Sequence, residues 1–459
     1  MVAGSAHAAT VAVRFGPAGD LGAVGLMVPG KGPTVTRAET LAALGELPRC
    51  EGRCDYLIYV SLPPRESRHN VTRYRVAIAG TGYEGGLLLS SHTRIPGLLA
   101  ADDVGATARA LARGEQPPVT ARPDRDAGAE LRVLDRRLAR AHDARDSATL
   151  LMVSLLTVYG LIGLVKRSRL FALAAVLVPP VAMVTALILS GVGAGRPSVV
   201  LTALGVATAA GSLAASALLR DDRALGAAFV LFLLAYLIVM WTWPVTNSLA
   251  VIGPHPDGGG RYYGVTNEMS TLMLAPALLA GCLLGRAVLL PVTALALVTV
   301  GASFSGADGG GVLTLVAGFL MLGLRMTGRL EWRRVTVATG AAAALAFAFV
   351  GLDAAFGSSH VTRAVGGGPD DVLGDWGHRL HVSWDGVTSS WYHVLLMLIA
   401  LAALVFVATR RPRFAVVDAL LVAIVVSLLV NDTPVDVAGF GALSAVTLWS
   451  WRRAEQGVE

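Results

Sequence analysis

The sequence predicts an α-helical polytopic membrane protein of about eleven spans that follow an N-terminal α/β domain. Its composition is 54% hydrophobic and 15% charged, whereas soluble domains carry about 25% charged residues. Charges are spread through the first part of the chain, up to Ser147, and no apolar run there approaches the ~18 residues that a membrane span requires. Beyond Ser147 the chain is almost entirely apolar. We therefore expect an α/β domain at 1–127, a connector at 128–147 and a membrane domain at 148–453.

The α/β domain is predicted from the alternation of strand-like and helix-like segments. Short β-branched or aliphatic runs indicate strands, and apolar residues at helical spacing indicate helices. Thr36 suits the N-cap of the first helix, and Asp102 or Asp103 that of the second. A charged helix at Glu130–Arg145 then leads into the first span. The predicted strands are Thr10–Phe15, Asp55–Ser61, Tyr74–Ala79 and Gly86–Leu89, and the predicted helices are Ala38–Leu47 and Val104–Arg113.

The spans are apolar segments, most of them near the ~20 residues that a membrane helix needs. Of the basic residues in their connections, fifteen occupy one set of alternate loops and four (Arg196, Arg261, Arg363 and Arg379) the opposite set. The positive-inside rule places the C-terminus in the cytoplasm and the N-terminal domain outside the cell membrane. The predicted spans are 148–165, 171–190, 198–219, 224–243, 269–285, 287–302, 312–324, 335–352, 394–408, 414–430 and 437–450.

Export of the N-terminal domain bears on the chain start and on the cysteines. Ala6-His7-Ala8 has the small-x-small form of a signal-peptidase site, so we expect a true start upstream; an ordinary flexible N-terminus is the alternative. Cys50 and Cys54 would then lie in an oxidising compartment, and the sequence is compatible both with a disulfide between them and with two free thiols. Cys282 is interpreted as a packing residue.

Several classes of function are excluded or disfavoured. The net charge of +6 comes with 38 Lys+Arg that do not cluster on one predicted face, so nucleic acid is not an expected partner. No nucleotide loop, zinc-protease signature or nucleophile elbow occurs, which argues against cytosolic nucleotide hydrolysis. His378 and His381 are interpreted as a solvated pair because no third ligand is identifiable, and no metal site or cofactor is predicted.

The ionisable residues of the membrane half gather in the outer connections. In Gly253–Glu268, glycines accompany Arg261, Tyr262, Tyr263 and Asn267, which we assign to substrate binding, and Glu268, a candidate base. An arginine fork binds phosphate or carboxylate, and an interfacial carboxylate can accept a proton, so the stretch suits an anionic lipid-linked substrate. The alternative is a glycine-rich loop with an Arg261–Glu268 ion pair and interfacial tyrosines.

Two further breaks supply candidate catalytic carboxylates. Asp308 lies in the glycine-rich stretch Ser303–Gly311, which is either a re-entrant turn lining a cavity or a tight hairpin. Asp432 interrupts an apolar run just before Pro434, where a functional carboxylate and a helix cap are both open. Arg379, in a tryptophan-containing outer loop, is assigned to substrate binding. We expect Arg261, Glu268, Asp308 and Asp432 to share one site.

Two segments, Leu21–Leu44 and Gly85–Leu111, resemble the extracytoplasmic domain of an uncharacterised family of bacterial multi-spanning proteins. In that family a domain similar to the alkaline-phosphatase superfamily precedes a membrane half with "GRFYGxxNE"-like and "NDS"-like segments; Gly260–Glu268 and Asn431–Thr433 are similar to these. The resemblance implies a Ser or Thr nucleophile near Thr34 or Thr36 and metals held by Asp and His. The expected ligands are missing, because His69 and His92 stand isolated in the sequence, so the domain is expected to be degenerate and to bind or position a partner.

These observations favour a cell-envelope protein that acts at the outer face on a lipid-linked or anionic polymeric substrate, as a transferase or ligase. Membrane lipid or a lipid-linked substrate is the expected partner, with an envelope protein as a further partner of the N-terminal domain. A transporter or flippase is the alternative, although such proteins carry charges deep within their spans, where this chain has almost none apart from Asp418. A non-catalytic envelope scaffold is the third class.

Overall fold

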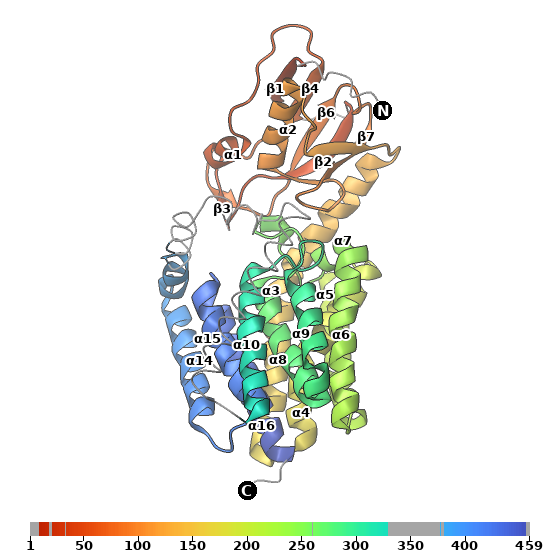
Figure 1. Ribbon diagram of the computed structural model, residues 1–459. Helices are drawn as coiled ribbons and strands as arrows, with labels where there is room; N and C mark the ends of the chain where they lie inside the picture. The colour runs from red at the N-terminus through yellow and green to blue at the C-terminus, as the bar shows by residue number, and fades with distance from the viewer. Residues whose placement is uncertain are drawn as a thin grey trace. The chain divides into compact units, whose positions relative to one another are not determined.

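The computed structural model describes residues 9–17, 21–32, 34–258, 260–328, 377 and 381–455. The chain forms two compact units, and each draws on separate stretches of sequence (Figure 1). The first unit comprises Met1–Asp146, Gly193–Ser198 and Pro244–Tyr263. The second comprises Ser147–Val192, Val199–Trp243 and Gly264–Glu459. The loop Pro244–Tyr263, which lies between two predicted spans in sequence, therefore belongs to the α/β unit.

The first unit is built on a mixed seven-stranded sheet with the order β1-β4-β6-β2-β7-β9, in which β8 also pairs with β2. The neighbours β1 and β4 run parallel, as do β2 and both β7 and β8, whereas β6 and β9 run antiparallel to their neighbours. A separate two-stranded ribbon pairs β3 (Thr34–Val35) with β5 (Arg68–His69). The sheet strands are β1 Val11–Phe15, β2 Ala23–Val28, β4 Tyr56–Val60, β6 Tyr74–Ala79, β7 Gly86–Ser90, β8 Leu98–Ala100 and β9 Val119–Arg122.

Helices cover the two faces of this sheet. Alternate residues of β2 point to opposite faces, so Ala23 and Met27 join one core and Val24, Leu26 and Val28 the other. The first core also contains buried residues of α1 (Arg37–Leu44) and α2 (Ala101–Arg113). The second contains Leu131, Leu134 and Leu138, spaced three and four residues apart on α3 (Ala127–Lys166). The segment predicted as a charged connector thus supplies an apolar stripe to the core of the α/β unit.

The predicted strands and helices of this unit are present, whereas the short strands β3, β5, β8 and β9 and the central strand β2 were not predicted. Strand β2 was not predicted, because all six of its residues are buried and its apolar run lacks the alternation of a half-buried strand. Thr36 caps α1 in a capping box with Glu39, as predicted. The cap predicted at Asp102 or Asp103 is wrong: Ala100 is the N-cap of α2, and the Asp103 carboxylate accepts a hydrogen bond from its backbone N–H.

The second unit is helical. Ten of the eleven apolar segments predicted as spans coincide with helices, and the eleventh, 335–352, lies outside the described residues. Within the described chain, seven helices are long and apolar enough to cross a membrane, and α9 and α15 are shorter apolar helices. The ten helices that coincide with predicted spans are the second half of α3, α4 Arg169–Gly191, α5 Pro197–Leu218, α6 Asp222–Thr242, α8 Asn267–Leu284, α9 Arg286–Gly301, α10 Gly309–Thr327, α14 Trp391–Thr409, α15 Ala415–Val430 and α16 Pro434–Glu455.

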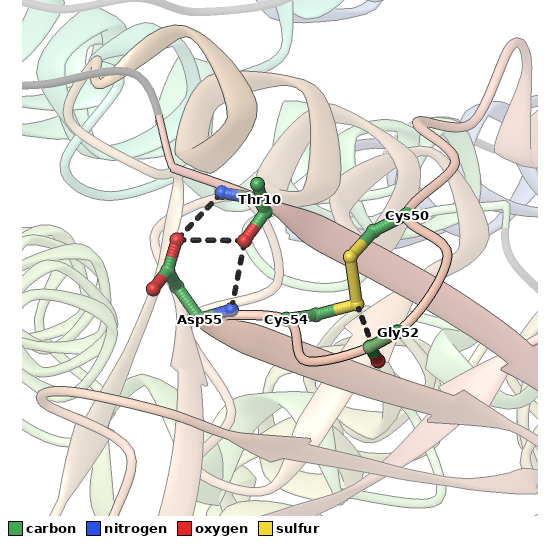
Figure 2. The surroundings of a disulfide bond; sticks show 5 residues. All are labelled: Thr10, Cys50, Gly52, Cys54 and Asp55. Carbon is green, nitrogen blue, oxygen red and sulfur yellow. Dashed lines mark hydrogen bonds between the residues drawn. A yellow bond between two sulfur atoms is a disulfide. The ribbon is translucent and has the colours of Figure 1, made fainter.

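A disulfide closes the loop that precedes β4 (Figure 2). Cys50 and Cys54 form the bond, so of the two alternatives left open by the sequence the structure contains the disulfide. Next to it, the Thr10 backbone N–H and hydroxyl donate to the same Asp55 oxygen at 2.8 and 2.7 Å, and the Asp55 N–H donates to the Thr10 hydroxyl at 3.0 Å. These bonds fasten the starts of β1 and β4 to each other.

Candidate functional site

The α/β unit gathers its polar loops at the carboxyl edge of the parallel strands. Strand β2 leads into the loop that contains Gly30 and Gly32, β7 leads into Ser90–Arg94, and β8 leads directly into α2. Open α/β sheets bind ligands beyond the carboxyl ends of their parallel strands. This edge is therefore where a ligand site is expected in this unit.

The loop Pro244–Tyr263, which contains α7 (Pro244–Ser248) and the 3-10 turn η1 (Pro256–Gly258), packs on this edge. The buried Asn70 side-chain NH₂ donates to the carbonyls of Gly30, Gly32 and Gly258 at 2.8, 3.0 and 3.1 Å. The Tyr262 ring meets the His92 ring edge to face, with centroids 5.3 Å apart. The loop thereby closes over segments that follow β2 and β7.

The two tyrosines assigned to substrate binding have structural contacts here. Tyr262 is 5% exposed and belongs to the core that α3 covers. Tyr263 packs against that core, and the Arg94 guanidinium lies 4.0 Å from the centre of its ring. Arg94 itself has a φ of 55°, a left-handed conformation that a non-glycine residue seldom adopts. The tyrosines hold the loop against the sheet edge and leave little of Tyr262 for a substrate.

His92 is not isolated, contrary to the expectation from the sequence. Its Nδ1 lies 3.0 Å from an Asp103 oxygen and 3.9 Å from an Asp102 oxygen. The other Asp103 oxygen accepts bonds from the Ser90 hydroxyl at 2.8 Å and the Ala100 N–H at 3.0 Å. One ligand atom from each of His92, Asp102 and Asp103 lies within 4.8 Å of the others.

A second charged cluster fixes the same loop to α3. Asp257 is 2% exposed, and its two oxygens accept from the Arg145 fork at 3.0 and 3.2 Å. One of these oxygens also lies 2.6 Å from His142 Nδ1. Because His142 and Arg145 are three residues apart, both project from one face of α3. The spacing of His142 and Arg145 can be read from the sequence, whereas their contact with Asp257, 112 residues from Arg145, cannot.

Electrostatics in this cluster favour an ionised Asp257 and a neutral His255. Burial raises the pKa of Asp257, but the hydrogen bonds and positive charge of Arg145 and the bond with His142 outweigh it, so the pKa is lowered. Burial, reinforced by the charge of Arg145, lowers the pKa of His255 to about 4. The cluster therefore holds one compensated carboxylate beside an imidazole that resists protonation.

In the helical unit, the segment that carries Asn267 and Glu268 contacts the segment that carries Asp432. The Asn267 amide, in the first turn of α8, donates to an Asp432 oxygen at 2.6 Å across 165 residues of sequence. Asp432 is exposed and follows the end of α15, just before α16 begins at Pro434. Through this bond Asp432 bridges to α8, and its role as a functional carboxylate or as a helix cap before Pro434 stays a prediction.

The glycine-rich break Ser303–Gly311 lies beside the break at Asn431–Thr433. Asp308, 2% exposed, precedes α10, and a Cβ added at Gly310 would lie 2.2 Å from Asn431 Oδ1 and 3.7 Å from Asp308 Oδ1. Only glycine fits between these groups. The turn before α10 also accepts a bond from the Val265 N–H at the Gly306 carbonyl, 2.8 Å away. The segments that carry Asn267, Glu268, Asp308 and Asp432 thus converge at one end of the helical unit.

The remaining predicted site residues are distributed as follows. Arg261, half-buried, belongs to the first unit together with Tyr262 and Tyr263, whereas Glu268 follows the N-cap Thr266 and belongs to the second. Arg379 and His378 lie outside the described residues. A single site formed by Arg261 with the three carboxylates stays a prediction.

Comparison of the chain with protein-family models, with curated proteins and with solved structures gives no match in any of the three.

Proposed function

We propose that this chain is a multi-pass protein of the cell membrane with its first unit outside and its C-terminus in the cytoplasm. The seven long apolar helices, the shorter α9 and α15, and α16 supply ten spans, with 335–352 as the eleventh. The fifteen-to-four distribution of basic residues supports the orientation. The Cys50–Cys54 disulfide supports it as well, because disulfides persist in oxidising compartments.

We further propose that the protein acts at the outer face on a lipid-linked or anionic polymeric substrate, as a transferase or ligase of the envelope. The observation that carries this proposal is the hydrogen bond between Asn267 and Asp432. Because Asp308 lies beside Asn431, the polar residues of three separate interhelical segments come together at one end of the helical unit. Asp308 and Asn431 are buried, and polar groups buried within a membrane domain are costly and tend to be functional.

Each residue of the site has a proposed role. Glu268 or Asp308 accepts a proton from the attacking group, and Asp432 orients them through Asn267. Arg261 and Arg379 hold the anionic group, for which a guanidinium fork is better suited than an ammonium. The resemblance to multi-spanning envelope proteins with a degenerate phosphatase-like domain agrees with this proposal and forms part of it.

The topology is tested by single-cysteine labelling in intact cells. Cys282→Ala removes the free thiol that the described chain contains. Gly260→Cys adds an outer probe where a new side chain meets open space, and Arg410→Cys adds an exposed inner one. A membrane-impermeant maleimide should label Gly260→Cys without lysis and Arg410→Cys only after lysis. Labelling of both from one side contradicts the orientation.

The activity is tested by complementation. A deletion strain of the source organism should lose or accumulate an anionic envelope component, measured by mass spectrometry of lipid-linked and polymer fractions. The native chain should restore it, whereas Arg261→Lys should not, despite its conserved charge. Arg410→Lys, in a predicted cytoplasmic loop, serves as the matched control. Restoration by Arg261→Lys to the native level contradicts the assigned role of Arg261.

A further inference from the structure

The end of the helical unit at which α14 and α16 finish carries basic and aromatic residues that the proposed function does not use. We propose that Arg453 and Trp449, in the last two turns of α16, bind the phosphate of an anionic phospholipid whose acyl chains lie along α14. The proposal rests on the membrane insertion proposed above and goes beyond it by naming a lipid and its site. It is separate from the candidate site at Asn267 and Asp432.

Arg453 is a cation without a partner in the described part of the chain. Its guanidinium carbon lies 5.4 Å from the centre of the Trp449 ring, and its side chain forms no hydrogen bond or ion pair with a described residue. The neighbouring Arg452 differs, because it pairs with Glu455 and lies 3.8 Å from Asp222. A guanidinium stacked on an aromatic ring keeps the N–H groups of its edge, so Arg453 can donate to a phosphate that lies in its plane.

Three described carboxylates at this end of the unit already contact other cations. Besides the Arg452 contacts of Glu455 and Asp222, Glu455 contacts Arg169 at 3.4 Å. Asp418, which lies in the first turn of α15 soon after α14 ends, contacts two further arginines. None of the three neutralises Arg453, so an anion from outside the chain complements its charge.

Trp449 supplies an independent indication of a ligand. The residue is 2% exposed, and its indole N–H has no acceptor within the described residues. The Phe406 ring of α14 meets the indole edge to face, with centroids 5.8 Å apart, so the unpaired donor belongs to the contact between the two helices. A buried donor without an acceptor is costly, and a phosphate oxygen held by Arg453 supplies one.

The exposed face of α14 favours a lipid over free phosphate. Of the seven long apolar helices, α14 buries the smallest share of its most apolar stretch, 17%. Leu398, Leu401 and Val405 are exposed and recur every three or four residues, so they form one apolar stripe that leads towards Phe406. A lipid with its acyl chains on this stripe places its phosphate at the helix ends, beside Arg453. Basic side chains at the ends of membrane helices attract anionic lipids in this way.

The test is lipid binding by the purified, delipidated full chain in detergent, measured by native mass spectrometry. Phosphatidylglycerol should bind more tightly than phosphatidylcholine, which carries no net charge. Arg453→Gln should weaken phosphatidylglycerol binding about tenfold and leave phosphatidylcholine binding unchanged, because a hydrogen bond between charged groups is lost. Trp449→Phe, which keeps an aromatic ring and removes the N–H, should weaken it by a smaller factor of about three.

Arg223→Gln is the matched control. Arg223 is an exposed arginine in the first turn of α6, next to the Asp222 that contacts Arg452, and it has no described partner. Its substitution removes the same charge from the same end of the helical unit and should leave the phosphatidylglycerol affinity unchanged. Circular dichroism melting of Arg453→Gln without lipid should match that of the native chain, which excludes misfolding as the cause of lost binding.

Three outcomes overturn the proposal. Equal affinity for the two lipids, or equal loss of phosphatidylglycerol binding in Arg453→Gln and Arg223→Gln, leaves only diffuse attraction. Displacement of the lipid by excess inorganic phosphate assigns the site to free phosphate instead of a lipid. These results do not bear on the labelling or complementation experiments, because a chain in detergent has no orientation and Arg261→Lys leaves α14 and α16 unaltered.

Discussion

Asp418 and Asp432 lie near opposite ends of α15, and their surroundings differ. Asp418 is 6% exposed, and its oxygens contact Arg325 at 2.9 Å and Arg413 at 3.3 Å. Asp432 is exposed, and its described partner is the neutral amide of Asn267. Within the described chain, no cationic side chain forms an ion pair with Asp432.

The difference separates carboxylates that are paired with arginines from one that is exposed and bonded to a neutral amide. Arg325 ends α10 and Asp418 begins α15, so their ion pair fastens two antiparallel helices at one end. Asp257 plays the same part in the first unit, where Arg145 and His142 compensate it. A carboxylate without a compensating cation contributes little to stability and keeps its charge for a ligand. Four predictions follow this division, from the largest effect to the smallest.

Asp257→Asn should destabilise the first unit most. The substitution leaves the Arg145 guanidinium, a residue 8% exposed, without its counter-ion, and breaking a buried pair in this way costs about 3–5 kcal/mol. The first unit contains no tryptophan, so amide hydrogen exchange of β2 and of the first half of α3 is the suitable measurement. Exchange in both segments should accelerate.

The double variant Asp257→Asn/Arg145→Met is the control for this prediction. Removing both charges leaves no buried ion, so protection should recover in part relative to Asp257→Asn alone. If the single variant exchanges like the native chain, Asp257 is not a structural carboxylate and the comparison with Asp432 fails.

Asp418→Asn should have a smaller effect of about 2 kcal/mol, because the arginines it leaves behind are better hydrated. The Arg325 and Arg413 side chains are 27% and 51% exposed. A thermal scan of the full chain that follows tryptophan fluorescence reports the second unit, since all eight tryptophans belong to it. An unchanged midpoint would show that the ion pair at this end of α15 does not hold the helices.

Acid should weaken the first unit through His255. Its pKa is about 4 in the folded chain and about 6.5 in an unfolded one, so the unfolded chain takes up the proton first. The stability contributed by neutral His255 is present above pH 6.5 and is lost as the pH falls from 6.5 towards 4, by at most about 1.4 kcal/mol per pH unit.

Hydrogen exchange of α3 measured across this pH range, after correction for the intrinsic rate, checks the effect of acid. His255→Gln should flatten the pH dependence above pH 4, whereas His69→Ala, an exposed histidine of β5, should not. Below about pH 3.8, protonation of Asp257 acts in the same direction, because its folded pKa is also lowered. A slope that survives in His255→Gln would assign the effect to another group.

Local patterns in the sequence predict most elements of this fold, and the failures have physical causes. The capping box of Thr36 and Glu39 needs four consecutive residues, so it is readable in advance. The central strand β2 escaped prediction because a strand covered on both faces reads as an apolar run without alternation. Ten apolar segments coincide with helices because length and hydropathy are local properties.

The candidate sites depend on contacts that no local pattern contains. The glycine-rich and Asn-Asp breaks were visible, but the Asn267–Asp432 bond that joins two of them spans 165 residues. His92 is separated from Asp102 and Asp103 by β8, and only the pairing of β8 with β2 turns α2 back towards it. The loop Gly253–Tyr263 was interpreted as a connection at the membrane surface, yet its tyrosines complete a core of the α/β unit.

Asp432→Asn should change stability least and function most. The residue is exposed, and asparagine can still accept the Asn267 hydrogen bond, so the free energy of unfolding should stay within about 0.5 kcal/mol of the native value. The substitution removes the charge and little else, so the complementation defined for the proposed function should fail. Asp385→Asn, at another exposed carboxylate, is the matched control and should complement normally. A large fall in the thermal midpoint of Asp432→Asn would show that Asp432, like Asp418, is a structural carboxylate. Full complementation by Asp432→Asn would show that Asp432 is not part of the functional site. Loss of complementation at native stability is the result that supports different roles for Asp418 and Asp432.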